Sequence, residues 1–147
     1  FLVPGAPGQS LTMDGCRRLA GSNPEVAAAR AAADKLAKKA ELLDCQFLLY
    51  RYAAEKGDAA AARVLGGYYD PDTWSKEKSP LPAPNPTEAA RWHKQAAEKG
   101  DAESQYRYGM LLKLGRTDAT DGPEQGLAWL RKAAEQGNAL AKEELAR

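Results

Sequence analysis

The chain has 147 residues, 44% of them apolar, which suits one domain with a hydrophobic core. Its 21 basic and 20 acidic residues leave a formal net charge of +1, which argues against a nucleic-acid-binding protein because such proteins are usually strongly basic. No run of about 18 apolar residues occurs, so the sequence predicts no helix that spans a membrane.

The first 41 residues differ from the rest of the chain. Residues 1–10 hold two prolines and two glycines among few large side chains, and they predict an extended arm. Residues 11–41 predict N-terminal capping helices: Gly21 ends a short helix, Ser22 or Asn23 caps the next, and Pro24 fits the first turn of that helix.

The two cysteines, Cys16 and Cys45, form neither a disulfide framework nor a zinc pattern, because a structural zinc site takes four nitrogen or sulfur ligands and the chain has one histidine. They either pair with each other or remain two free buried thiols, and we adopt the disulfide as a hypothesis. Such a bond would stabilise the fold by ~3.6 kcal/mol on chain-entropy grounds. The cysteine pair and the first residue, Phe1 in place of methionine, favour a periplasmic or otherwise exported protein; Phe1 indicates a removed signal peptide or an excised piece.

Residues 25–56 contain neither glycine nor proline, and apolar residues recur there at alternating spacings of three and four. The pattern predicts either one long helix or two helices with a bend near residues 39–41. The apolar stripe suits a coiled coil or packing within the chain, and the repeats beside it favour the second.

One phrase of seven residues organises the remainder. It reads Ala-Ala-Glu-Lys-Gly-Asp-Ala at residues 53–59 and 96–102, and Ala-Ala-Glu-Gln-Gly-Asn-Ala at residues 133–139. Its glycines, which we call the corner glycines, are 43 and then 37 residues apart, a period typical of repeat arrays. Glycine closes one helix and Asp or Asn caps the next, so each copy predicts a hairpin of two antiparallel helices.

The agreement between the copies extends beyond the phrase. A large apolar residue stands four residues before each copy, and a small residue stands nine residues after each corner glycine. These positions are Leu49, Trp92 and Trp129, and Gly66, Gly109 and Ala146. The large residue shares a helix face with the first alanine of the phrase, and the small residue predicts close packing against a neighbouring helix.

Residues 92–102, followed by Tyr106 and Gly109, resemble the Sel1-like repeat, and residues 129–139 are similar again. The first copy departs from the pattern at Leu49 and Arg63, and the third departs at Glu143. The resemblance covers about residues 42–147, with repeats at about 42–85, 86–122 and 123–147. It implies an all-α fold, an α/α solenoid of three helical hairpins with an N-terminal helical capping segment, used mainly for contact with other proteins.

The longer first interval is explained by residues 70–86, which hold five of the nine prolines and predict a loop. Loops inserted in repeat proteins often lie on a binding face. Trp74 stands in this loop, where it is either a contact for a partner or a residue that folds back onto the helices.

The candidate partner-binding residues are those that a protein contact would use most, namely exposed aromatic and charged side chains. They are Tyr68, Tyr69 and Trp74, with His93 and Arg107 as weaker candidates. His93 is expected on the surface because it follows the core position of Trp92. No pattern in the sequence places a serine, a histidine and an aspartate together, so we expect no enzyme, no metal site and no cofactor.

The resemblance points to a bacterial adaptor or scaffold that binds a partner protein in the cell envelope. One alternative is an immunity or inhibitor protein that blocks a toxin or hydrolase, since a proline-stiffened loop could fill a cleft at low entropic cost. Another is binding of peptidoglycan or a glycan through Trp74 and the tyrosines.

Overall fold

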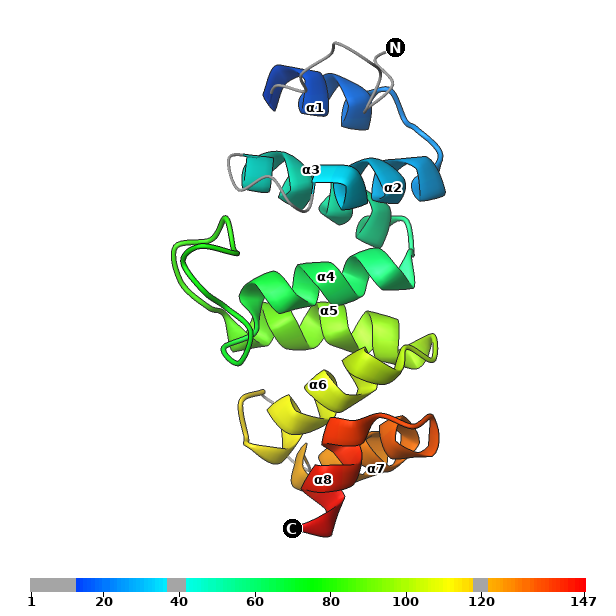
Figure 1. The fold of residues 1–147 in the computed structure, drawn as a ribbon, viewed down its shortest axis with the longest axis vertical. Helices are drawn as coiled ribbons and strands as arrows, with labels where there is room; N and C mark the ends of the chain where they lie inside the picture. The colour runs from blue at the N-terminus through cyan, green and yellow to red at the C-terminus, as the bar shows by residue number, and fades with distance from the viewer. Residues whose placement is uncertain (1–12, 37–41, 118–121) are drawn as a thin grey trace.

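The computed structural model describes residues 13–36, 42–117 and 122–147, which form eight α-helices and no strand (Figure 1). The predicted arm at residues 1–10 and the predicted bend at residues 39–41 lie outside the described residues. The helices are α1 Met13–Gly21, α2 Val26–Leu36, α3 Leu43–Glu55, α4 Ala59–Tyr69, α5 Pro86–Glu98, α6 Ala102–Lys113, α7 Gly122–Glu135 and α8 Ala139–Ala146.

The helices stack along the long axis of the molecule, with α1 and α8 at opposite ends of the stack (Figure 1). From α2 onward each helix packs against the next, and α1 packs against α3. Because α2 and α3 pack against each other, the glycine-free stretch forms two helices and not one. The predicted all-α solenoid is confirmed, while the exact limits of the arm, the cap and the repeats stay a prediction.

Each hairpin turns at a corner that the repeated phrase explains. The backbone of the three corner glycines is left-handed, with φ of +99°, +95° and +94°. The residue after each glycine then caps the second helix, because its carboxylate or amide oxygen accepts a 2.9 Å hydrogen bond from the backbone N–H three residues later. These capping residues are Asp58, Asp101 and Asn138.

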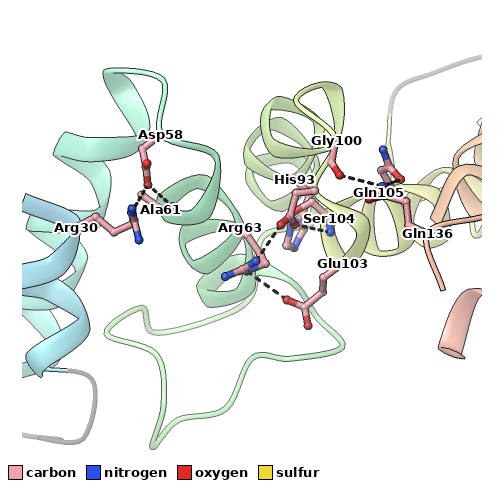
Figure 2. Close-up of polar contacts among 11 residues, drawn as sticks. Arg30, Asp58, Ala61, Arg63, His93, Gly100, Glu103, Ser104, Gln105 and Gln136 are labelled. Atoms are coloured by element: carbon pink, nitrogen blue, oxygen red, sulfur yellow. Dashed lines mark hydrogen bonds and ion pairs between the residues drawn. The ribbon is translucent and has the colours of Figure 1, made fainter. Parts of the chain in front are cut away.

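Neighbouring corners are joined by side chains at one repeat position, directly before the corner glycine. Lys99 Nζ donates to the carbonyl oxygen of Gly57. Gln136 Nε2 donates to the carbonyl oxygen of Gly100 at 2.9 Å (Figure 2). The corners therefore lie side by side along one edge of the stack, which is the arrangement that the repeats predict.

Arginines of the second helices reinforce this edge (Figure 2). Arg63 on α4 pairs with Asp101 at 2.8 Å and with Glu103 at 3.5 Å. Arg30 on α2 pairs in the same way with Asp58 at 3.0 Å. Arg63, which departs from the Sel1-like pattern, thus links two repeats, and α2 takes the place that a second helix of a preceding repeat would take.

Cys16 on α1 and Cys45 on α3 form a disulfide with a Cα–Cα distance of 5.7 Å, so the alternative of two free thiols does not describe this structure. Both cysteines are fully buried in the cluster that holds Leu19 and Leu49. The bond fastens the first helix of the cap to the first helix of the repeats.

Glycines allow α6 and α7 to approach closely. A Cβ added to Gly126 would lie 2.6 Å from the carbonyl oxygen of Gly109 and 2.8 Å from the backbone nitrogen of Lys113. Neither backbone atom can move away without shifting a helix. The small residue nine positions after the second corner is therefore explained by helix contact, as the sequence predicts.

We expect Gly126→Ala to lower the free energy of unfolding by ~1–3 kcal/mol, because the cost of overpacking exceeds the gain in helix propensity. Urea denaturation followed by circular dichroism measures it. Gly21→Ala is the matched control: Gly21 ends α1 with no atom within 4 Å of an added Cβ, so this variant keeps or raises the stability. Equal stability of the two variants would contradict the close approach of α6 and α7.

Candidate protein-binding surface

The loop of residues 70–85 connects α4 to α5. It projects from the side of the stack that lies opposite the corners (Figure 1). Its first residues are held by a turn, in which the backbone N–H of Asp72 donates to the Asp70 carboxylate at 2.9 Å. Thr73 Oγ1 donates back to the carbonyl oxygen of Gly67 at 2.7 Å. The loop therefore leaves α4 in a defined direction.

The return of the loop is anchored as well. Buried Ser79 donates from Oγ to the carbonyl oxygen of Tyr68 at 2.9 Å. The backbone N–H of Asn85 donates to the carbonyl oxygen of Tyr69 at 2.8 Å, and the Asn85 side chain caps α5. Nothing in the amino-acid pattern singled out Ser79, because one serine in a polar loop has no distinguishing signal.

Trp74 lies half-buried inside this loop. Its indole N–H donates to the carbonyl oxygen of Leu81 at 3.1 Å, so the ring spans the two limbs of the loop. This bond lies within the loop, so it shows neither of the two possibilities that the sequence leaves open, and the role of Trp74 as a partner contact stays a prediction. A partner would meet only the exposed part of the ring.

His93 is buried, with 2% of its surface exposed, so its expected place on the surface is wrong. Helix α5 packs against α4 on one side and α6 on the other, and Trp92 and the residue after it are therefore both covered. His93 Nε2 lies 3.3 Å from Asp70 Oδ2. The ring fits because Gly66 lacks a Cβ, which would stand 2.7 Å from two ring atoms.

Ser104 on α6 completes a constellation that the sequence analysis did not expect. Its hydroxyl lies 3.5 Å from His93 Nδ1 (Figure 2). The imidazole therefore lies between the Ser104 hydroxyl and the Asp70 carboxylate. All three side chains are at most 2% exposed, so no substrate reaches the hydroxyl. The constellation instead ties the start of the loop to α5 and α6.

The charge of Asp70 depends on this buried contact. Burial raises the pKa of the carboxyl, but a hydrogen bond from His93, another from the backbone of Asp72, and the charges of His93 and Arg107 outweigh burial and hold the pKa below its ordinary value of 3.8. The ionised carboxylate thus stabilises the fold fully above pH 3.8, and this contribution is lost as the pH falls through the lowered pKa.

We therefore expect Asp70→Asn to be less stable than the wild type at pH 5, and by a smaller amount as the pH falls below about 4. Urea denaturation at a series of pH values measures the difference. The exposed Asp72→Asn variant is the control, with a small and level effect. A difference for Asp70→Asn that stays unchanged down to pH 2.5 would contradict the lowered pKa.

Tyr68 and Tyr69 lie half-buried where the loop returns to α4. The Tyr68 hydroxyl donates to Gln46 Oε1 at 3.1 Å, and its ring centroid lies 6.1 Å from that of Phe47. The Tyr69 ring meets Phe47 edge-on at 6.1 Å. Arg107, also half-buried, stacks on Tyr106 with its guanidinium 5.2 Å from the ring centroid.

Four of the five predicted site residues are thus gathered around one feature, the 70–85 loop. Tyr68 and Tyr69 lie at its base, Trp74 lies within it, and His93 lies beneath it. Arg107 lies on α6, stacked on Tyr106. Only His93 is fully buried, so four of the five keep some surface for a partner.

A second surface was not predicted from the sequence. We call the helices α3, α5 and α7 the first helices, because each is the first helix of its hairpin. One side of each is exposed, and we call these exposed sides together the first-helix face. Its residues are Arg51 and Glu55, then Arg91, Lys94 and Glu98, then Ala128, Arg131 and Glu135. At its N-terminal end lies a depression of about 250 Å³, lined by Ala20, Leu48, Arg51, Tyr52, Glu55 and Lys56. The sequence held one sign of this depression, since Leu48 and Tyr52 are large residues one turn apart that lie outside the predicted core positions.

No helix in the described part of the chain is long and apolar enough to cross a membrane. No group of three or more histidine, cysteine, aspartate or glutamate side chains is placed there to hold a metal ion.

Comparison with known proteins confirms the family resemblance. The sequence model of the Sel1 repeat matches residues 78–101 and 102–138. The fold is similar to a Sel1 repeat protein from Oxalobacter formigenes, with 25% identity, a TM-score of 0.67, and coverage of 88% of this chain and 36% of that one. It is also similar to c5321, a protective antigen present in uropathogenic Escherichia coli strains with an SLR fold, with 22% identity, a TM-score of 0.68, and coverage of 90% and 27%.

The chain therefore spans about a third or less of the length of these solved structures, and the second likeness concerns the fold alone. No curated protein matches the sequence.

Proposed function

We propose that this α/α solenoid, which carries Sel1 repeats within residues 78–138, is an adaptor or scaffold that binds a partner protein. Sel1 repeats are in general protein-interaction modules, and the proteins that contain them are typically non-catalytic. The binding surface that we propose is the first-helix face together with the 70–85 loop. The proposal gives this chain no catalytic step.

The observation that carries the proposal is the rigid joining of the repeats. Lys99 and Gln136 connect neighbouring corners, and Gln95 Nε2 on α5 donates to the carbonyl oxygen of Ala54 on α3 at 2.6 Å. The first helices are thereby held side by side, with charged side chains exposed on each of them. A preordered surface of this kind binds a partner without losing conformational entropy.

We propose further that the protein works in the bacterial cell envelope, in the periplasm or otherwise exported. The disulfide between Cys16 and Cys45 supports this location, because such bonds persist in oxidising compartments and are rare in the cytosol. Trapping of free thiols in intact cells tests the location: an exported protein carries no free thiol. A fully reduced protein in the cell would contradict it.

The anchored loop favours a second candidate function, inhibition of a toxin or hydrolase. Asp70 and Ser79 fix the two limbs of the loop, while Lys76, Glu77 and Lys78 at its tip are exposed. A loop fixed in advance can enter a cleft at little entropic cost. Binding of a glycan has less support. The Tyr68 hydroxyl and the Trp74 indole N–H already donate hydrogen bonds to groups within the protein, so they are not available to a sugar.

Photo-cross-linking in the bacterium that encodes the chain tests the binding function. The cross-linking residue replaces exposed Lys94 on the first-helix face, exposed Lys76 on the loop, or exposed Lys142 on α8 as the control. We expect one protein, identified by mass spectrometry, to be captured from Lys94, from Lys76 or from both, and not from Lys142. Capture from none of the positions, or only from Lys142, would contradict the proposal. Capture from Lys76 alone would favour the inhibitor.

A further inference from the structure

Charges on the first helices follow one order. Each first helix has an acidic residue in its first turn and a glutamate as its last residue, and its exposed basic residues lie between them. The acidic residues are Asp44, Glu88 and Glu124, and Glu55, Glu98 and Glu135. We call four of the exposed basic residues the basic row, namely Arg51, Arg91, Lys94 and Arg131. Lys132 is exposed as well, but its ammonium lies over the Trp129 ring, 4.6 Å from the centroid, and it is not counted in the row.

Three members of the basic row occupy one repeat position. Arg51, Lys94 and Arg131 each stand six residues before a corner glycine, one turn before the last glutamate of their helix. The C-terminal ends of the first helices are neighbours, because Gln95 and Lys99 reach the end of α3 and Gln136 reaches the end of α5. Residues at equivalent positions near these ends therefore form a line that crosses the stack. A row of positive charge thus runs between two rows of negative charge.

The basic row is not used to hold the repeats together. Within the described residues, Lys94 and Arg131 form no ion pair. Arg51 pairs only with Glu55 of its own helix, at 2.7 Å, and Arg91 pairs only with Glu88, at 3.5 Å. Exposed pairs of this kind contribute little and can be exchanged for a partner's charge. The arginines that join repeats, Arg30 and Arg63, stand on second helices instead.

An aromatic residue, Tyr69 at the end of α4, packs against Phe47 of α3 and against the cluster that holds Ala89 and Ala90 of α5. Burial and the charge of Glu88 raise the pKa of its hydroxyl, and the charges of Arg51 and Arg91 lower it. The Tyr69 ring rests edge-on against Phe47. Tyrosine and arginine are the residues that most often dominate the energy of protein interfaces.

We propose that the basic row binds an acidic segment of the partner protein, whose carboxylates pair with Arg51, Lys94 and Arg131 in turn. This inference rests on the proposed function and names the chemistry of the partner. Guanidinium and carboxylate form paired hydrogen bonds of matching geometry. The chain has a net charge of only +1, whereas nucleic-acid-binding proteins are usually strongly basic, so a short acidic protein segment fits better than nucleic acid.

The test measures binding of a labelled polyglutamate peptide by fluorescence anisotropy. The row variant carries Arg51→Glu, Lys94→Glu and Arg131→Glu. The control variant carries Lys35→Glu, Arg116→Glu and Lys142→Glu, which are exposed, lie outside the proposed binding surface and change the net charge equally. We expect the wild type to bind polyglutamate with an affinity that falls with salt. The row variant should lose about tenfold or more, and the control about twofold or less.

A neutral row variant carries glutamine at the same three positions, and it replaces the charge-reversed variant in the test if the charge reversals unfold the protein. Circular dichroism checks the helix content of every variant. Equal losses in the row and control variants would overturn the proposal, as would no binding of polyglutamate. Tighter binding of an oligonucleotide of equal length would overturn it in favour of nucleic acid. If a partner captured by cross-linking binds the row variant as tightly as the wild type, this inference fails while the proposed function stands.

Discussion

Replacing Cys16 and Cys45 with alanine is expected to lower the free energy of unfolding by ~3.6 kcal/mol, the loss of loop-closure entropy for cysteines 29 residues apart. Both side chains are fully buried, and alanine leaves no polar group without a partner. The loss should be concentrated at the N-terminal end, since the bond fastens α1 to α3. Urea denaturation measures the loss, and hydrogen exchange locates it.

The wild type unfolded and refolded in the presence of a reductant is the matched control, and it should show the same loss as the double variant. Exchange should quicken in α1 and α2 and stay unchanged in α5 to α8. A double variant as stable as the oxidised wild type would contradict the disulfide. A loss spread evenly over all helices would contradict its role as a local fastening of the cap.

His93→Leu is expected to cost ~3–5 kcal/mol, because it leaves the Asp70 carboxylate buried without its partner. Asp70 is 1% exposed, so water cannot replace the imidazole. The loss should also loosen the 70–85 loop, since Asp70 holds the turn that starts it. Thermal or urea denaturation measures the stability, and proteolysis between Lys76 and Lys78 reports on the loop.

The double variant Asp70→Asn with His93→Leu is the control that isolates the charge. It should be more stable than His93→Leu alone, because no ionised group is then buried, and asparagine can still accept the hydrogen bond from the backbone of Asp72. A His93→Leu protein that matches the wild type in stability and in loop proteolysis would mean that the Asp70–His93 contact does not hold the loop.

The hairpins could be predicted because their causes are local. Glycine at a left-handed corner and Asp or Asn at the following cap are visible in seven residues, and the structure shows both at Gly57, Gly100 and Gly137. The cysteine pair could be suggested but not decided, because the distance between Cys16 and Cys45 depends on how α1 packs on α3.

The burial of His93 could not be predicted because it depends on two neighbours at once. A periodic pattern assigns one buried face to a helix, whereas α5 is covered by both α4 and α6. The partners of His93 come from positions 23 residues before it and 11 after it, Asp70 and Ser104. No spacing within a helix indicates such a contact.

The candidate surface could be predicted only in part. The proline-rich loop was visible in composition, but its anchors at Asp70 and Ser79 are polar residues of ordinary type. The basic row is visible in the sequence, because a basic residue stands six residues before each corner glycine. The sequence alone does not show which basic residues join repeats and which are exposed. In the structure Arg63 joins two repeats, whereas Lys94 and Arg131 are exposed.

The proposed function depends most on the first-helix face being the surface where a partner binds. The most direct measurement is the map of NMR chemical-shift changes of the backbone amides when the partner captured by cross-linking is added. We predict the largest changes near Arg51, Lys94 and Arg131 and in the 70–85 loop, with little change along α8. Changes confined to the second helices α4, α6 and α8 would contradict the account.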